Sequence, residues 1–301
     1  MFSSDLTQAV EKFAALLLPL SETDLARPWI WKDHDEEGIR FAFFVTIQEL
    51  RQLAVTFESD RVPPTQAQRI LSQYHAQYMD LQAAILGLSA EDSERAPTEG
   101  EWPVRRVYGH ILGADIIFSA VIRYALEGHR AGTWMPEEMS DEDELRLIGM
   151  SEDEYKALVR SPLSGMQAFH RKLHADILNE FSSITDEELD LPATFWEETR
   201  FPIRHRLHRY EAHIVQHTVQ IDKSLAAIEL APTETKRLMR YLYGALAQAE
   251  SALIGTEAPP FGPRARRGET AYGDGTGYGA ACSELAESIM ERTTEIRGIL
   301  K

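Results

Sequence analysis

Cysteine is the scarcest residue in this chain of 301 residues, where Cys282 is the only one. A single thiol can form neither an internal disulfide nor a cysteine metal cluster. No basic side chain stands near Cys282 in the sequence, which favours a small residue at the start of a helix over a nucleophile. Chains without disulfides are usual in reducing compartments, so we expect a cytoplasmic protein.

Positive charge is also in short supply. The chain has 31 Lys and Arg residues against 48 Asp and Glu residues, a formal net charge of −17. An acidic surface repels phosphate backbones and anionic headgroups, so we expect neither a nucleic-acid nor a membrane partner. No apolar run approaches the ~20 residues that a membrane-spanning helix needs. The first residues lack the basic start of a signal peptide and predict an amphipathic helix instead.

Strand signals are rare, whereas apolar residues recur at helical spacing along most of the chain. The sequence therefore predicts an all-α fold. Long helices joined by moderate connections favour antiparallel bundles. The expected helices span about 5–20, 39–57, 65–86, 102–130, 162–181, 202–230, 233–254 and 283–300.

The predicted helices group into a central bundle with additions at both ends. Residues 63–231 are expected to form an up-down four-helix bundle. Residues 1–62 are expected to be a helix pair and a degenerate half-bundle, because "LLPLSETDLARP" at 17–28 echoes "AILGLSAEDSERAP" at 84–97. Residues 232–301 predict a second helix pair that packs with the first. The Gly/Pro-rich loop inside that pair is either a lid or a plain connection.

The stretch "RYEAHIVQHTVQI" carries two histidines, His213 and His217, four residues apart. Side chains at this spacing lie on one face of a helix, which suits two ligands of one ion as well as a hydrogen-bonded core pair. A zincin is excluded, because its HExxH motif needs a glutamate where Ile214 stands.

A third histidine, His110, lies in "YGHILGAD" and is expected to point inward from its own helix. Glycine costs about 1 kcal/mol inside a helix, so Gly109 and Gly113 indicate close approach by another group. Three imidazoles from two helices can meet inside a bundle. Such a set, with open positions left on the ion, is typical of catalytic metal sites.

The two histidine segments together resemble the DinB-like family of metal-binding four-helix bundles, which includes thiol-dependent S-transferases and isomerases. "EWPVRRVYGHILGAD" is similar to the tryptophan-then-histidine helix of that family, and "RYEAHIVQHTVQI" to its HxxxH helix. The resemblance covers about 65–230 and implies a metal site formed by His110, His213 and His217.

Four more residues are candidates for supporting the site. Trp102 either lines a pocket or anchors helix packing. Asp115 either orients an imidazole or, as we prefer, pairs with an arginine. Glu211 faces another side of the helix and reaches the site only through a bend or a loop contact, and Gln220 follows the last histidine at a position familiar in the family.

The remaining histidines are assigned less chemistry. His205 and His208 are expected to be solvated or to support the ligands from outside. Another set is expected at the surface, although two of its members also stand four apart: His75, His129, His170 and His174.

These observations predict a metal-dependent enzyme acting on a small molecule. The ion would be divalent, Zn²⁺ or Ni²⁺, between which imidazole ligands choose poorly. The resemblance implies hydrolysis, or transfer of a low-molecular-weight thiol, and it allows a homodimer. The alternative is a non-catalytic metal-binding or stress-associated helical module.

Overall fold

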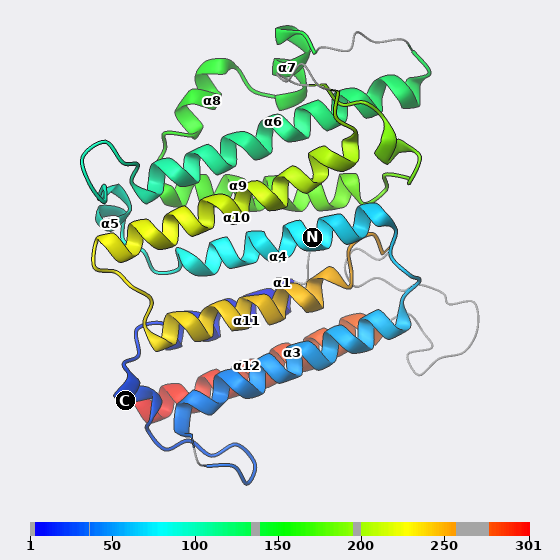
Figure 1. Ribbon diagram of the computed structural model, residues 1–301. Helices are drawn as coiled ribbons and strands as arrows, with labels where there is room; N and C mark the ends of the chain where they lie inside the picture. Colours follow the sequence, from blue (N-terminus) through cyan, green and yellow to red (C-terminus); the bar gives the residue numbers. More distant parts are fainter. Residues whose placement is uncertain (1–3, 36, 134–138, 195–199, 257–276) are drawn as a thin grey trace. The chain divides into compact units, whose positions relative to one another are not determined.

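The computed structural model describes residues 4–35, 37–133, 139–194, 200–256 and 277–301. Within these ranges the chain contains helices and no strands, apart from two isolated bridges, so the all-α prediction is confirmed. It divides into two compact units, 64–231 and 1–63 with 232–301. Figure 1 shows the helices of both units.

The unit formed by the two ends of the chain contains α1 (Ser4–Leu17), α2 (Glu22–Leu25), α3 (Phe41–Asp60), α11 (Glu234–Ser251) and α12 (Gly277–Leu300). Helix α1 packs against α12, and α3 against α11. Cys282 is buried in α12, and burial raises the pKa of its thiol to about 12, which keeps the sulfur protonated and unreactive. The Gly/Pro-rich loop lies almost entirely outside the described residues.

The other unit is built on four long helices. They are α4 (Gln66–Ala84), α6 (Val104–Ala131), α9 (Leu163–Phe181) and α10 (Ile203–Ala227), with shorter α5 (Ala90–Glu94), α7 (Asp141–Ile148) and α8 (Glu152–Leu158). Thr65 and Gln68 form a capping box at the start of α4. Prolines precede the first turns of α6 and α10, where a missing N–H costs nothing.

The long helices of this bundle do not simply alternate in direction. Figure 1 shows α4 and α10 running one way and α6 and α9 the other. The chain leaves the end of α6, returns along that helix through α7 and α8, and only then enters α9. The returning segment therefore covers part of α6.

Gly109 and Gly113 are the positions on α6 that this returning segment contacts. A Cβ atom on Gly109 would lie 2.3 Å from the carbonyl oxygen of Val159, and one on Gly113 would lie 2.6 Å from the Tyr155 hydroxyl. The close approach expected from these glycines is thus made by the protein itself and not by a ligand.

We expect Gly109→Ala to destabilise the protein by about 1–3 kcal/mol, because a backbone carbonyl cannot move aside as a side chain can. Gly244→Ala in α11 is the matched control. Nothing lies within 4 Å of a Cβ at that position, so alanine should stabilise by up to about 1 kcal/mol. Urea unfolding of both variants tests this. A Gly109→Ala protein as stable as Gly244→Ala would contradict the packing described for α6.

Helix α6 is the one described helix that is long and apolar enough, by length and composition, to cross a membrane. The relevant window has a mean hydropathy of 1.3, although glycine and polar residues interrupt it, and 72% of it is buried within the protein. A buried core helix passes the same test, so this composition is accounted for by packing inside the bundle.

Three histidines that the sequence analysis places at the surface are in fact buried. His170 and His174 lie on the inner stripe of α9, and His75 lies on the inner face of α4. Nδ1 of His75 is 3.3 Å from Nε2 of His174, and the ring of Tyr78 stacks on His174 at 3.8 Å between centroids. The surface prediction is wrong for these three because they share the helical register of apolar neighbours; His129 is exposed.

Candidate metal site

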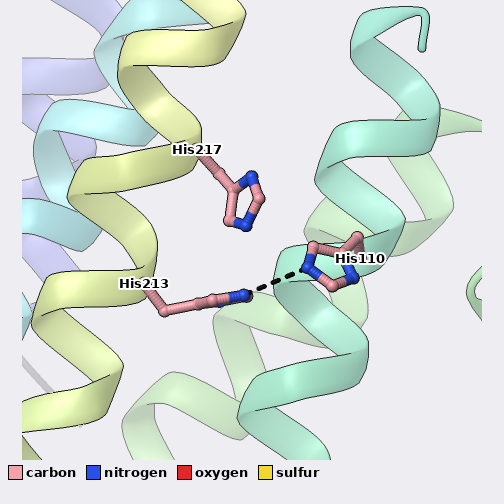
Figure 2. Close-up of side chains that lie close together, drawn as sticks. All are labelled: His110, His213 and His217. Carbon is pink, nitrogen blue, oxygen red and sulfur yellow. Dashed lines mark hydrogen bonds between the residues drawn. The ribbon is translucent and has the colours of Figure 1, made fainter. Parts of the chain in front are cut away.

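Helices α6 and α10 bring three histidines together. His110 comes from α6, and His213 and His217 come from successive turns of α10. Nε2 of His110 and Nε2 of His213 are 3.1 Å apart, and one nitrogen from each of the three rings lies within 4.8 Å of the others. Figure 2 shows the three imidazoles facing one another between the two helices.

The cluster lies at the edge of the bundle rather than in its core. His213 and His217 are buried, but His110 is exposed, so the expectation that His110 points inward is wrong. The inner face of α6 is taken instead by residues such as Ile111 and Asp115, which have no exposed surface. The site is therefore open to solvent on the α6 side.

Gln220 determines which nitrogen of His217 is available. Its Oε1 atom is 2.9 Å from Nδ1 of His217. An amide oxygen can only accept, so Nδ1 carries the proton and Nε2 keeps its lone pair. A hydrogen bond of this kind on the outer nitrogen is the usual support of a metal-binding imidazole.

The electrostatic environment keeps the imidazoles of His110 and His213 neutral. Burial, followed by His217, His110 and Arg209, lowers the pKa of His213 to about 3. Partial desolvation beside the neighbouring rings, followed by the charge of His217, also lowers the pKa of His110. Neutral imidazole is the form that binds metal, so these two rings need no proton removed before they can serve as ligands at neutral pH.

The residues fit a metal ion. Two nitrogens on a tetrahedral zinc ion, each about 2.0–2.1 Å from it, lie roughly 3.3 Å apart, close to the separation of the His110 and His213 nitrogens. Nδ1 of His213 is buried without a hydrogen-bond partner among the described residues, so only Nε2 of this ring is engaged. The same 3.1 Å contact is also compatible with a hydrogen bond between two neutral imidazoles.

The family model of the DinB superfamily matches residues 73–221, which lie wholly within the bundle of residues 64–231. The bundle belongs to the DinB superfamily. No curated protein and no solved structure matches the chain. Its three-histidine cluster fits a metal-binding member of this superfamily.

The other predicted site residues of the DinB bundle differ in their distance from the histidines. The Trp102 ring lies edge-on to His110, with 5.6 Å between centroids. Glu211 faces away and lies 3.9 Å from Nδ1 of the exposed His208. His205 stacks on Phe201 at 4.1 Å. Trp102 and Gln220 are therefore the two of the four candidates that contact a site histidine.

Among the described residues, Asp115 contacts neither an arginine nor a site histidine. Its carboxylate accepts a hydrogen bond from the Tyr74 hydroxyl at 2.9 Å and lies 3.0 Å from Nε2 of His170. The preferred pairing with an arginine is wrong, because α6 buries Asp115 completely against α4 and α9, where none of the described arginines contacts it. Asp115 does orient an imidazole, but the imidazole belongs to His170.

A cleft of about 600 Å³ opens beside His110 and His213 in the DinB bundle. It is lined by α6, the α8 segment and the first half of α10, and its size suits a small molecule. Sequence reasoning did not place Tyr155, Arg160 and Arg209 at the site. Only Arg209 left a signal, since it stands one helical turn before His213.

The depressed pKa of His213 predicts a pH dependence for the metal-free protein. Between pH 6.5 and about 3 the unfolded chain binds a proton at this residue and the folded chain does not. Stability should therefore fall as the pH drops below 6.5, and His213→Leu should reduce that slope.

Urea unfolding in chelator between pH 7 and 5 measures this effect. Glu188 also makes the folded protein less stable at low pH. The hydrogen bond that it accepts from Arg130 lowers its pKa to about 2, so its contribution to stability is lost only as the pH falls towards and below its ordinary pKa of 4.5. An unchanged slope in His213→Leu would contradict the prediction.

Proposed function

We propose that this protein is a metal-dependent enzyme that acts on a small molecule, as a hydrolase or as a small-thiol S-transferase. The observation that carries the proposal is the position of the cluster. The imidazoles of His110 and His213 form part of the wall of a cleft, with that of His217 beside them, so the cluster is not sealed in the core. A structural metal site is usually closed, whereas a catalytic one keeps a position open to substrate.

His110, His213 and His217 would hold the ion, Zn²⁺ or Ni²⁺, with Gln220 fixing the ring of His217. A divalent ion there would supply a nucleophile near neutral pH by lowering the pKa of a water molecule or a thiol. In transfer, the thiol sulfur bonds to an electrophilic carbon, while the thiol proton and the leaving group depart. In hydrolysis, water takes the place of the thiol.

Among the described residues that line the cleft, Tyr155 carries the hydroxyl group that could assist the departure of the leaving group. Burial, followed by the charge of Glu144, raises the pKa of Tyr155, so its hydroxyl stays protonated and can donate a hydrogen bond. The proposal includes a cytoplasmic location, which rests on the single buried thiol of Cys282.

One observation favours a second candidate, a non-catalytic metal-binding module. Among the described residues that line the cleft, no carboxylate is present to act as a base. Melting with and without a chelator separates the two functions. Removal of a structural ion should cost most of the stability of the protein. Removal of a catalytic ion from a preformed bundle should cost little stability and should abolish turnover.

The test of the enzyme proposal is activity after reconstitution. Protein purified without a nickel column would be loaded with zinc or nickel and assayed for ester hydrolysis and for thiol consumption with an alkyl halide. We expect turnover that requires the ion and is lost in the His213→Ala/His217→Ala variant. A protein that binds no ion after incubation with either metal would overturn the proposal.

A further inference from the structure

Three arginines line the cleft beside the histidine cluster: Arg106, Arg160 and Arg209. On a chain with a net charge of −17, a wall with three guanidinium groups is unexpected. Among the described residues, no carboxylate pairs with any of the three. Arginines nearby are paired, since Arg105 contacts Glu94 and Arg204 contacts Asp190. The positive charge of the cleft is therefore available to a ligand.

The geometry ties two of these arginines to the metal site. Arg106 stands one turn before His110 on α6, and its Cζ atom lies 4.3 Å from the centre of the Trp102 ring, which itself contacts His110. Arg209 stands one turn before His213 on α10, and its charge acts on that histidine. Because α6 and α10 run antiparallel, the two arginines flank the cluster from opposite ends (Figure 1).

We propose that the cleft selects a small carboxylate-bearing molecule. Its carboxylate pairs with the guanidinium of Arg106 or Arg209, and its apolar part lies against Trp102 and Phe118, with the reacting atoms beside the histidines. Guanidinium matches a planar carboxylate with two parallel hydrogen bonds. That this molecule is a substrate rests on the proposed function, whereas binding of the molecule requires only the arginines.

The inference predicts selective binding of benzoate. Calorimetric titration of the chelator-treated full chain would compare benzoate with benzyl alcohol, a neutral molecule of similar size, and with inorganic phosphate. Benzoate should bind more tightly than both. In the Arg106→Gln/Arg209→Gln variant its affinity should fall about tenfold or more, as expected when hydrogen bonds to a charged group are lost.

Arg204→Gln is the matched control, because Arg204 lies on α10 but pairs with the exposed Asp190. It should bind benzoate like the unaltered chain. The Arg106→Gln and Arg209→Gln single variants, checked for helicity, report on each arginine separately.

Three results would overturn the proposal. Benzoate could bind the double arginine variant undiminished, benzyl alcohol could bind as tightly as benzoate, or phosphate could bind as tightly as benzoate. The titrations use chelator-treated protein and are therefore independent of the metal, whereas the metal proposal is tested by reconstitution. A failure of the arginine prediction and a failure of the metal proposal are therefore separately visible.

Discussion

Replacing His213 by alanine is expected to lower zinc affinity by more than about 100-fold. Loss of a group that merely supports a ligand already costs 10–100-fold in affinity, and loss of a ligand should cost more. His213 is buried, held neutral and 3.1 Å from Nε2 of His110, so no other described side chain is placed to replace it. Competition with a fluorescent zinc chelator measures the change.

A graded series strengthens this test. Gln220→Ala removes the hydrogen bond to Nδ1 of His217 and should cost about 10–100-fold. His208→Ala, on the same helix but exposed, should leave zinc affinity unchanged. If His213→Ala and His208→Ala bound zinc equally well, the three histidines would not be the ligands.

Replacing Asp115 by alanine is expected to be the most destabilising change in the bundle, at about 3–5 kcal/mol. The carboxylate is completely buried and accepts from the hydroxyl of Tyr74, while His170 lies 3.0 Å from the same oxygen. Burial raises the pKa of Asp115, against the effect of these hydrogen bonds. Alanine would leave both partners buried and unsatisfied.

Asp115→Asn is the informative comparison. Both hydrogen bonds reach Oδ2, and Oδ1 has no partner among the described residues, so an asparagine can keep both bonds through its amide oxygen. Its loss should be smaller, about 1–2 kcal/mol. Urea unfolding of the two variants decides the matter. Equal losses would show that charge, and not the two hydrogen bonds, determines the stability of this core.

Part of the three-histidine cluster could be predicted from the sequence, because the spacing of two of its residues is a local pattern on one helix. The spacing of His213 and His217 fixes a shared helical face, and resemblance to a family supplied His110 as the partner from a distant helix. The exposure of His110 could not be predicted. Periodicity gives the faces of α6, but which neighbour covers each face is decided by packing between helices.

The same limit explains the misplaced histidines and the missed cleft wall. His170 and His174 have the same spacing as His213 and His217, and only the packing of α9 against α4 and α6 shows that they are buried. The cleft wall depends on the return of the chain along α6, which brings Tyr155 and Arg160 beside His110. The acidic segment that connects α6 to α9 contains no local sequence pattern that predicts this return along α6.

The pairing of the chain's two ends has a consequence for how the protein is made on the ribosome. Helices α1 and α3 are synthesised first, yet the helices they pack against, α12 and α11, are synthesised last. The whole DinB bundle is translated in between, and residues 64–231 form a compact unit. This bundle can therefore fold before α11 and α12 are synthesised, whereas α1 and α3 expose apolar faces until those helices follow. Chaperones that hold early helices would bind α1 and α3 during this interval.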